Sequence, residues 1–197
     1  MKKVFLICLL QIGLTTLIPA NLAAASTCNY NSPGYIVNRY TDNNNGTVYD
    51  NYTGLTWQRC IMGTPWAAEA GICGTGTGEF INNWKTTLDN VVAFNQAEFS
   101  KGAAYDWRLP NIKELASIIN INCYNPAFDT SIFIVSKSDL WSSTPSSTLI
   151  ANSLNNSGAT YTYENNIWAM NLINGREIRA PWSDKKPALL VRGISGN

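Results

Sequence analysis

Residues 39–59 read RYTDNNNGTVYDNYTGLTWQR and contain the clearest β pattern in the chain. Short runs rich in Tyr, Thr and Val flank the turn Asn43-Asn44-Asn45-Gly46, and Asn-Gly is favoured in two-stranded turns because both residues tolerate positive φ. A second turn at 51–54 leads into the alternating segment 55–58. We therefore predict a tight antiparallel meander over residues 39–59.

Two helices are predicted after this meander. The first begins after Asn82 or Asn83 and ends at Gly102. The second begins within 110–114, where Asn111 and Glu114 are spaced like a capping box. Because each helix is apolar on one side, we expect each to lie on a sheet. The apolar residues are Trp84, Leu88, Val91, Val92 and Phe99 in the first helix, and Ile112, Leu115 and Ile119 in the second.

The remaining segments divide into loops and short strands. Residues 60–79 and the polar stretch 144–166 are predicted to be loops, the second long and exposed. The predicted strands are residues 140–143, 167–172 and 176–179, with a turn at Asn174-Gly175, and a last buried strand at 188–191. This order of elements predicts an α+β domain.

The N-terminus has the order of a secretory signal. Lys2 and Lys3 precede an apolar run over 4–18, and Ala23-Ala24-Ala25 supplies small residues for cleavage after Ala25. The run contains polar residues and is too short for a comfortable bilayer span. We expect a signal peptide at 1–25, followed by one domain at 26–197 with no membrane span.

The charge of the processed chain is close to neutral. Without Lys2 and Lys3, 14 basic residues become 12 against 13 acidic residues, a net charge near minus one. A chain with this balance has no global charge field for nucleic acid.

Because the N-terminus has the order of a secretory signal, we expect a bacterial protein that is secreted, periplasmic or on the cell surface.

Four cysteines remain after removal of the signal, because Cys8 lies within it: Cys28, Cys60, Cys73 and Cys123. In an oxidising compartment they predict two disulfides, for which four cysteines allow three pairings. We favour Cys60 with Cys73, a short loop, and Cys28 with Cys123, a long one. A metal site is disfavoured because the chain has no C-x-x-C pair and no histidine.

Several motifs, taken in order, resemble one family. They are residues 40–42 and 46–50, 53–60 (TGLTWQRC), 106–115 (DWRLPNIKEL), 123–127 (CYNPA), 141–143 (WSS) and 191–193 (VRG). Together they resemble the Lcl C-terminal domain family, named for a collagen-like adhesin of Legionella, over nearly the whole processed chain.

The resemblance implies a C-type-lectin-like fold, with two helices beside short antiparallel sheets and long loops. It also implies binding of sulfated glycosaminoglycans at a cell surface. The chain lacks the Glu-Pro-Asn, Gln-Pro-Asp and Trp-Asn-Asp signatures of calcium-dependent lectins. Calcium-dependent sugar recognition is therefore not expected.

The segment 107–110 is similar to formylglycine-generating enzymes, whose chemistry uses late cysteines. Here no cysteine follows Cys123, so we interpret the segment as structural. We expect Trp107 to be buried, Pro110 to fix the helix entry, and Arg108 to bond nearby carbonyls or a carboxylate.

Catalysis and metal binding are disfavoured by residue type and spacing. The chain contains no histidine, so neither a Ser-His-Asp nor a Cys-His set can form. Its acids show no recognisable acid/base spacing. Residues 42–46 with Asp50 offer oxygen ligands for calcium, but the spacing departs from the helix-loop-helix pattern and turn chemistry explains the Asn run. We predict no enzyme, catalytic residue, cofactor or metal ligand, with calcium as the open alternative.

Two groups of residues are candidates for ligand binding. Basic residues gather late in the chain, and they could form an anion-binding patch or be ordinary solvated strand charges. Of the seven tryptophans, two lie in loop-like segments beside prolines and could be exposed platforms for sugar rings. The candidates are Arg176, Arg179, Lys185 and Lys186 in the first group, and Trp66 and Trp182 in the second.

These observations favour an exported, adhesin-like binding module whose partner is a glycan, such as a sulfated polysaccharide. A structural or accessory subunit of a pilus or envelope assembly, with a protein partner, is the alternative. An enzyme on the same fold is the least favoured.

Overall fold

The computed structural model describes residues 27–29, 31, 36–74, 81–102, 106–135, 138–155 and 158–193. The predicted signal peptide lies outside these residues. These residues form two helices and four antiparallel sheets. In chain order the elements are β1 (Thr27–Cys28), β2 (Tyr40–Asp42), β3 (Thr47–Asp50), β4 (Leu55–Gln58), β5 (Trp66–Ala67), β6 (Ile72–Cys73), α1 (Trp84–Ser100), α2 (Ile112–Ile118), β7 (Cys123–Tyr124), β8 (Asp139–Asn155), β9 (Gly158–Asn171), β10 (Arg176–Pro181) and β11 (Val191–Arg192).

The predicted meander forms a four-stranded sheet in the order β11-β4-β3-β2. Asn44 and Gly46 adopt positive φ in its first turn, whereas Asn45, which directly precedes the glycine, does not. The Oδ1 atom of Asp42 accepts the backbone N–H of Asn44 at 2.8 Å, which closes the turn locally. The prediction for residues 39–59 is confirmed.

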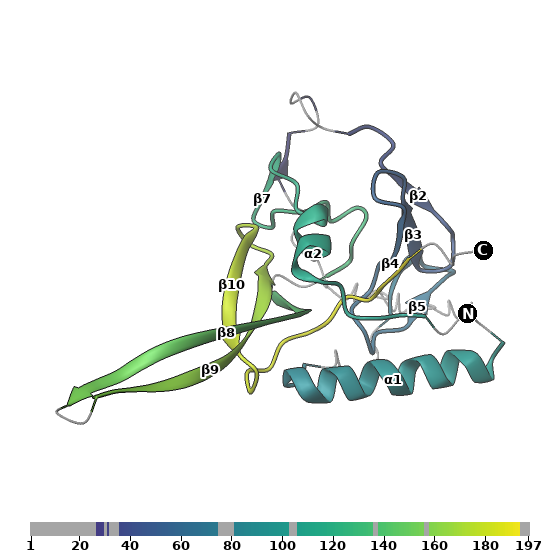
Figure 1. Cartoon of the computed structure of the whole chain (residues 1–197). Coiled ribbons are helices and arrows are strands. Elements are labelled where there is room, and N and C mark those ends of the chain that lie inside the picture. The colour runs from purple at the N-terminus through teal and green to yellow at the C-terminus, as the bar shows by residue number, and fades with distance from the viewer. Residues whose placement is uncertain are drawn as a thin grey trace, which may run out of the picture.

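A three-stranded sheet in the order β10-β9-β8 follows α2 in the chain. The prediction that residues 144–166 form a loop is wrong, because β8 and β9 pair through this region to Asn155↔Gly158. β10 pairs only with residues 166–171 of β9. The two longer strands therefore continue alone as a ribbon that projects from the rest of the molecule (Figure 1). We call residues 146–155 and 158–165 the arm.

The first helix packs differently from the prediction. The Asn83 side chain caps α1 by accepting the N–H of Thr86, but Val92 and Phe99 are exposed. The contacting face of α1 includes Val91, with Trp84, Leu88 and Phe94 partly buried against the same cluster. That cluster also contains Met62, Trp107, Leu109, Ala188 and Leu190, which all lie outside strands. Most of the helix thus lies on connecting segments, and only its first residue, Trp84, also packs on the three-stranded sheet.

The second helix agrees more closely with its prediction. Asn111 and Glu114 form the capping box, each side chain accepting the other's backbone N–H. Ile112, Leu115 and Ile118 are buried in the main core. That core also holds the ring of Trp57, which meets Phe133 edge-on. This helix packs against β8 and β9.

Residues 188–191 are fully buried, as predicted for a last core segment. Only Val191 with Arg192 is a strand, pairing with Trp57 and Thr56 of β4.

The DWRLP segment is structural, as predicted. Trp107 is buried, and Pro110 directly precedes the helix cap. The guanidinium of Arg108 donates two hydrogen bonds of 2.7 Å to the Glu114 carboxylate. Burial alone would raise the pKa of Glu114, but this pairing with Arg108 and the N–H of Asn111 hold the pKa below its ordinary value.

Two disulfides form with the favoured pairing. Cys60 bonds Cys73 across 13 residues, and Cys28 bonds Cys123 across 95. The second bond joins β1 to β7, whose register pairs the same two cysteines. Helices, short antiparallel sheets and both disulfides confirm the α+β class. Across the described ranges no helix is long and apolar enough to span a membrane.

Candidate functional site

A pocket of about 380 Å³ lies where the arm joins the rest of the molecule. Its walls come from the start of α1, from both arm strands and from the segment after β10, which lie close together in Figure 1. We call it the arm-root pocket, and its volume is in the range of small-molecule sites. Its lining residues are Trp84, Lys85, Pro145, Ser147, Asn165, Asn166, Ile167 and Trp182.

Backbone hydrogen bonds hold the two tryptophans of this pocket together. The N–H of Trp84 donates to the carbonyl oxygen of Trp182 at 3.0 Å, and the N–H of Trp182 donates to that of Asn165 at 3.4 Å. The first N–H groups of a helix have no intrahelical partner. The segment after β10 supplies the acceptor for the first N–H of α1 and so fixes the start of this helix. The result is one wall built from three distant parts of the chain.

The two indole rings differ in how firmly they are held and in how exposed they are. Nε1 of Trp84 donates to the carbonyl oxygen of Ser142 at 2.8 Å, which fixes this partly buried ring. Trp182 is 48% exposed. The pocket therefore combines a fixed aromatic wall with an accessible one.

The polar groups of the pocket are mostly amides. Asn165 is exposed, and the Nδ2 of Asn166 donates to Glu164 at 3.0 Å. Lys85 forms an exposed i,i+4 ion pair with Asp89. No lining residue has a carboxylate, thiol or imidazole. The arrangement can stack an apolar ring face and hydrogen-bond hydroxyl groups, but it offers no acid/base pair.

The late basic residues do not form one surface. The Lys186 side chain is only 12% exposed and pairs with Asp139 at 3.1 Å and Asp184 at 3.6 Å. Arg179 lies over the ring of Trp168, 5.1 Å from its centroid. Arg176 is also on β10 but three residues away, so strand alternation puts the two arginines on opposite faces. Lys185 is exposed in the following loop.

The structure separates the two predicted tryptophan platforms. Trp182 lines the arm-root pocket, whereas Trp66 belongs to β5 and is partly buried. The guanidinium of Arg59 lies 4.9 Å from the centroid of the Trp66 ring. The Trp66 Nε1 atom is buried without a hydrogen-bond partner. This ring is a packing element beside the first turn.

The two carboxylates that would have to bind calcium at residues 42–50 are both paired with arginine side chains. Asp42 accepts a 2.8 Å hydrogen bond from Arg59, and the buried Asp50 accepts bonds from Nε and Nη2 of Arg39 at 3.0 and 2.6 Å. Burial alone would raise the pKa of Asp50, but hydrogen bonds from Arg39, Thr53 and Tyr52 hold that pKa below its ordinary value. Within the described part of the chain, no group of three acidic or cysteine side chains is placed to hold a metal ion.

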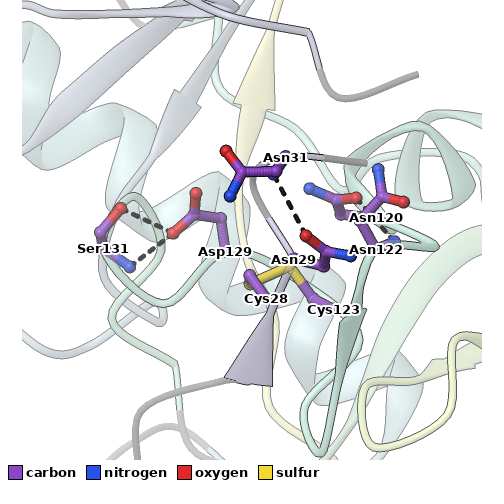
Figure 2. The surroundings of a disulfide bond; sticks show 8 residues. All are labelled: Cys28, Asn29, Asn31, Asn120, Asn122, Cys123, Asp129 and Ser131. Carbon is purple, nitrogen blue, oxygen red and sulfur yellow. Dashed lines mark hydrogen bonds between the residues drawn. A yellow bond between two sulfur atoms is a disulfide. The ribbon is translucent and has the colours of Figure 1, made fainter. Parts of the chain in front are cut away.

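A second cavity of about 360 Å³ has Asn120, Asp129 and Ser131 among its lining residues, and Figure 2 shows these three residues in the surroundings of the Cys28–Cys123 disulfide. Its buried acid, Asp129, accepts the N–H and the hydroxyl of Ser131 at 2.9 and 2.6 Å. Asn120 accepts the N–H of Asn122 in the same manner. Because these oxygens close local turns, we assign the cavity to loop packing.

Sequence reasoning missed most of the arm-root pocket. Trp84 is predicted on the apolar face of the first helix and is not one of the two selected tryptophan platforms, and Asn165 and Asn166 lie at the end of the predicted loop. One signal was present: residues 160–163 read TYTY, an alternation of β-branched and aromatic residues typical of a strand.

The family model of the Lcl C-terminal domain matches residues 46–192, which include every lining residue of the pocket. The chain belongs to this family. No curated protein and no solved structure matches the chain, so the C-type-lectin-like arrangement stays a prediction. Membership of this family indicates an adhesin-like surface module, and the two disulfides are typical of a location outside the cytoplasm.

Proposed function

We propose that this protein is an exported, adhesin-like module that binds a glycan at the arm-root pocket without catalysing a reaction. The observation that carries the proposal is the pairing of an exposed indole, Trp182, with a fixed indole, Trp84, beside two asparagine amides. Sugar rings have apolar faces that stack on aromatic rings and hydroxyl groups that bond to amides. The pocket offers both kinds of contact within one concave site.

The charges around the pocket favour an uncharged glycan over the sulfated polysaccharide expected from sequence. Lys186 has two carboxylates close by, Asp139 and Asp184. Lys85 has its own partner, Asp89. A sulfated chain would have to compete with these acids for each ammonium group, whereas a neutral sugar needs no free cation.

The test uses the exported, processed protein on an array of neutral glycans and on immobilised heparin. We expect Trp182→Ala to weaken binding to neutral glycans by at least about tenfold, the loss of one good stacking contact. Tyr124→Ala is the matched control, because Tyr124 is an exposed aromatic residue on β7, away from the pocket. Its binding should equal that of the wild type.

Two outcomes contradict the proposal. One is a Trp182→Ala variant that binds neutral glycans like the wild type. The other is retention on heparin alone, lost at high salt and in an Arg176→Ala/Lys185→Ala variant. That result would establish the sulfated-glycan hypothesis, because binding through exposed cations is screened by salt.

A second function is favoured by the edges of the arm. Among the described residues, no strand lies on the outer edge of β8 beyond Pro145 or on that of β9 from 158 to 164. Free strand edges can pair with another protein, as an accessory subunit of a pilus or envelope assembly would require. Crosslinking in the native envelope separates the two functions: one dominant protein partner, without glycan binding, supports the assembly role.

A further inference from the structure

An amine and a carboxamide meet on one carboxylate at the edge of the three-stranded sheet. Asp139, the first residue of β8, and Asn171, the last residue of β9, are register partners. The Nδ2 atom of Asn171 donates to Oδ1 of Asp139 at 2.7 Å. The Nζ atom of Lys186 lies 3.1 Å from Oδ2 of the same carboxylate. Asp139 therefore bridges the lysine and the asparagine.

The carboxamide of Asn171 has hydrogen-bond partners at both of its ends. Its Oδ1 atom accepts the N–H groups of Ile173 and Asn174, each at 3.1 Å. Two N–H donors on one carbonyl oxygen stabilise the negative charge that develops there when a nucleophile attacks the carbon. The Cγ atom of Asn171 is therefore activated toward attack.

The Lys186 side chain is shielded from water, and its backbone is fixed. The side chain is 12% exposed, and Nζ lies 5.5 Å from the ring centroid of the buried Trp141. The N–H of Lys186 donates to the carbonyl oxygen of Asn82, and the N–H of Trp141 donates to that of Pro187, both at 3.1 Å. Only the flexible stem of the lysine has to move to bring Nζ to the asparagine.

We propose that Lys186 and Asn171 form an intramolecular isopeptide bond, with Asp139 as the catalytic acid and base. Asp139 takes a proton from the Nζ ammonium, and the neutral amine attacks Cγ of Asn171. The Nζ–Cγ bond forms and the Cγ–Nδ2 bond breaks. The two protons lost by Nζ leave with Nδ2 as an ammonium ion. The carboxylate of Asp139 is regenerated, and nothing is oxidised or reduced.

This inference goes beyond glycan binding and does not depend on it. The bond joins the end of β9 to the segment between β10 and β11, so it closes a loop that contains β10. It also removes the charge of Lys186, which then contributes nothing to an anion-binding patch.

The test is the mass of the exported, processed protein after reduction of both disulfides. Compared with Lys186→Arg, and after correction for the exchanged side chain, the wild type should be lighter by about 17 Da, the mass of ammonia. Arginine keeps a positive charge beside Asp139 but cannot lose its proton to become a nucleophile. This variant therefore separates the reaction from simple ion pairing. Proteolysis of the wild type should also release two peptides joined through Lys186 and Asn171.

Two further variants assign the roles. Asp139→Ala should keep its ammonia, because the group that accepts and returns the protons is missing. Lys85→Arg is the matched control, because Lys85 is an exposed lysine that pairs with Asp89. This control should lose ammonia as the wild type does.

Four outcomes contradict the proposal. A wild type that has its full mass overturns the bond. A loss of about 18 Da, the mass of water, with Lys186 joined to Asp139 or to Asp184, which lies 3.6 Å from Nζ, overturns the assignment to Asn171. Loss of ammonia within a single peptide, as in cyclisation of an asparagine, also overturns the bond. A joined peptide pair in Asp139→Ala overturns the catalytic role of Asp139. None of these outcomes affects the glycan site.

Discussion

Replacement of Asp50 tests the energetics of the meander directly. Its carboxylate is fully buried and accepts four hydrogen bonds. Two come from Arg39, one from the N–H of Tyr52 at 3.0 Å and one from the hydroxyl of Thr53 at 2.8 Å. Asp50→Ala removes the acceptor for all four and leaves the guanidinium of Arg39, only 15% exposed, without its partner.

The expected loss of stability is large for a single substitution. Removing one member of a buried ion pair costs about 3–5 kcal/mol, because the remaining charge stays desolvated. We therefore expect the free energy of unfolding to fall by about 3–5 kcal/mol in Asp50→Ala. The surface pair of Lys85 and Asp89, with side chains 74% and 64% exposed, gives the comparison. Asp89→Ala should cost about 0.3–0.5 kcal/mol.

Urea is the suitable denaturant, since guanidinium salts would screen the ion pair under study. Unfolding of wild type, Asp50→Ala and Asp89→Ala is followed with both disulfides intact, and the midpoint is compared at constant m-value. Equal midpoints for the two variants would refute the reasoning, because burial would then have no effect on how much an ion pair contributes to the free energy of unfolding.

Further predictions concern acid and backbone conformation. Acidification from about pH 5 to pH 3 should lower the free energy of unfolding, because the pKa values of Asp50 and Glu114 are lowered in the folded state and the unfolded chain takes up protons first. Urea titrations at several pH values should show that the free energy of unfolding depends less steeply on pH in Asp50→Asn than in the wild type. An unchanged pH dependence would contradict the assignment. Gly46→Ala should lower stability by about 1–3 kcal/mol, since a Cβ at φ +82° would lie 2.5 Å from Cγ of Trp66. Gly71→Ala is the control, because Gly71 also has positive φ (+63°) but an added Cβ would meet nothing within 4 Å. Thermal unfolding should show a smaller loss of stability for Gly71→Ala than for Gly46→Ala. Equal losses in the two variants would show that the contact with Trp66 is unimportant.

Local signals explain which parts of the fold could be predicted from sequence. The turn at 43–46 and the capping box of Asn111 and Glu114 depend on residues within a few positions of each other. Their physical causes, positive φ and unpaired helix N–H groups, act without the rest of the chain. The disulfide pairing was one choice among three and needed the structure to establish it.

Long-range packing explains what sequence could not give. The Asn-rich and Ser-rich composition of 144–166 favoured a loop, although pairing between β8 and β9 satisfies its backbone. Phe99 fits the helical period but lies beyond the segments on which α1 packs. Lys186 is predicted to lie in a surface patch, because its sequence neighbours do not reveal that it pairs with Asp139, 47 residues away. The pocket was missed for the same reason, since three separate segments meet there.

The nesting of the two disulfides has a consequence for proteolysis. The bond between Cys28 and Cys123 encloses strands β2 to β6, both helices and the smaller bond between Cys60 and Cys73. A protease that cuts once anywhere from 29 to 122 opens the chain but releases no fragment, so the two pieces migrate together until a reductant is added. The C-terminal portion that bears the arm thus stays covalently joined to the segment around Cys28 after such a cut.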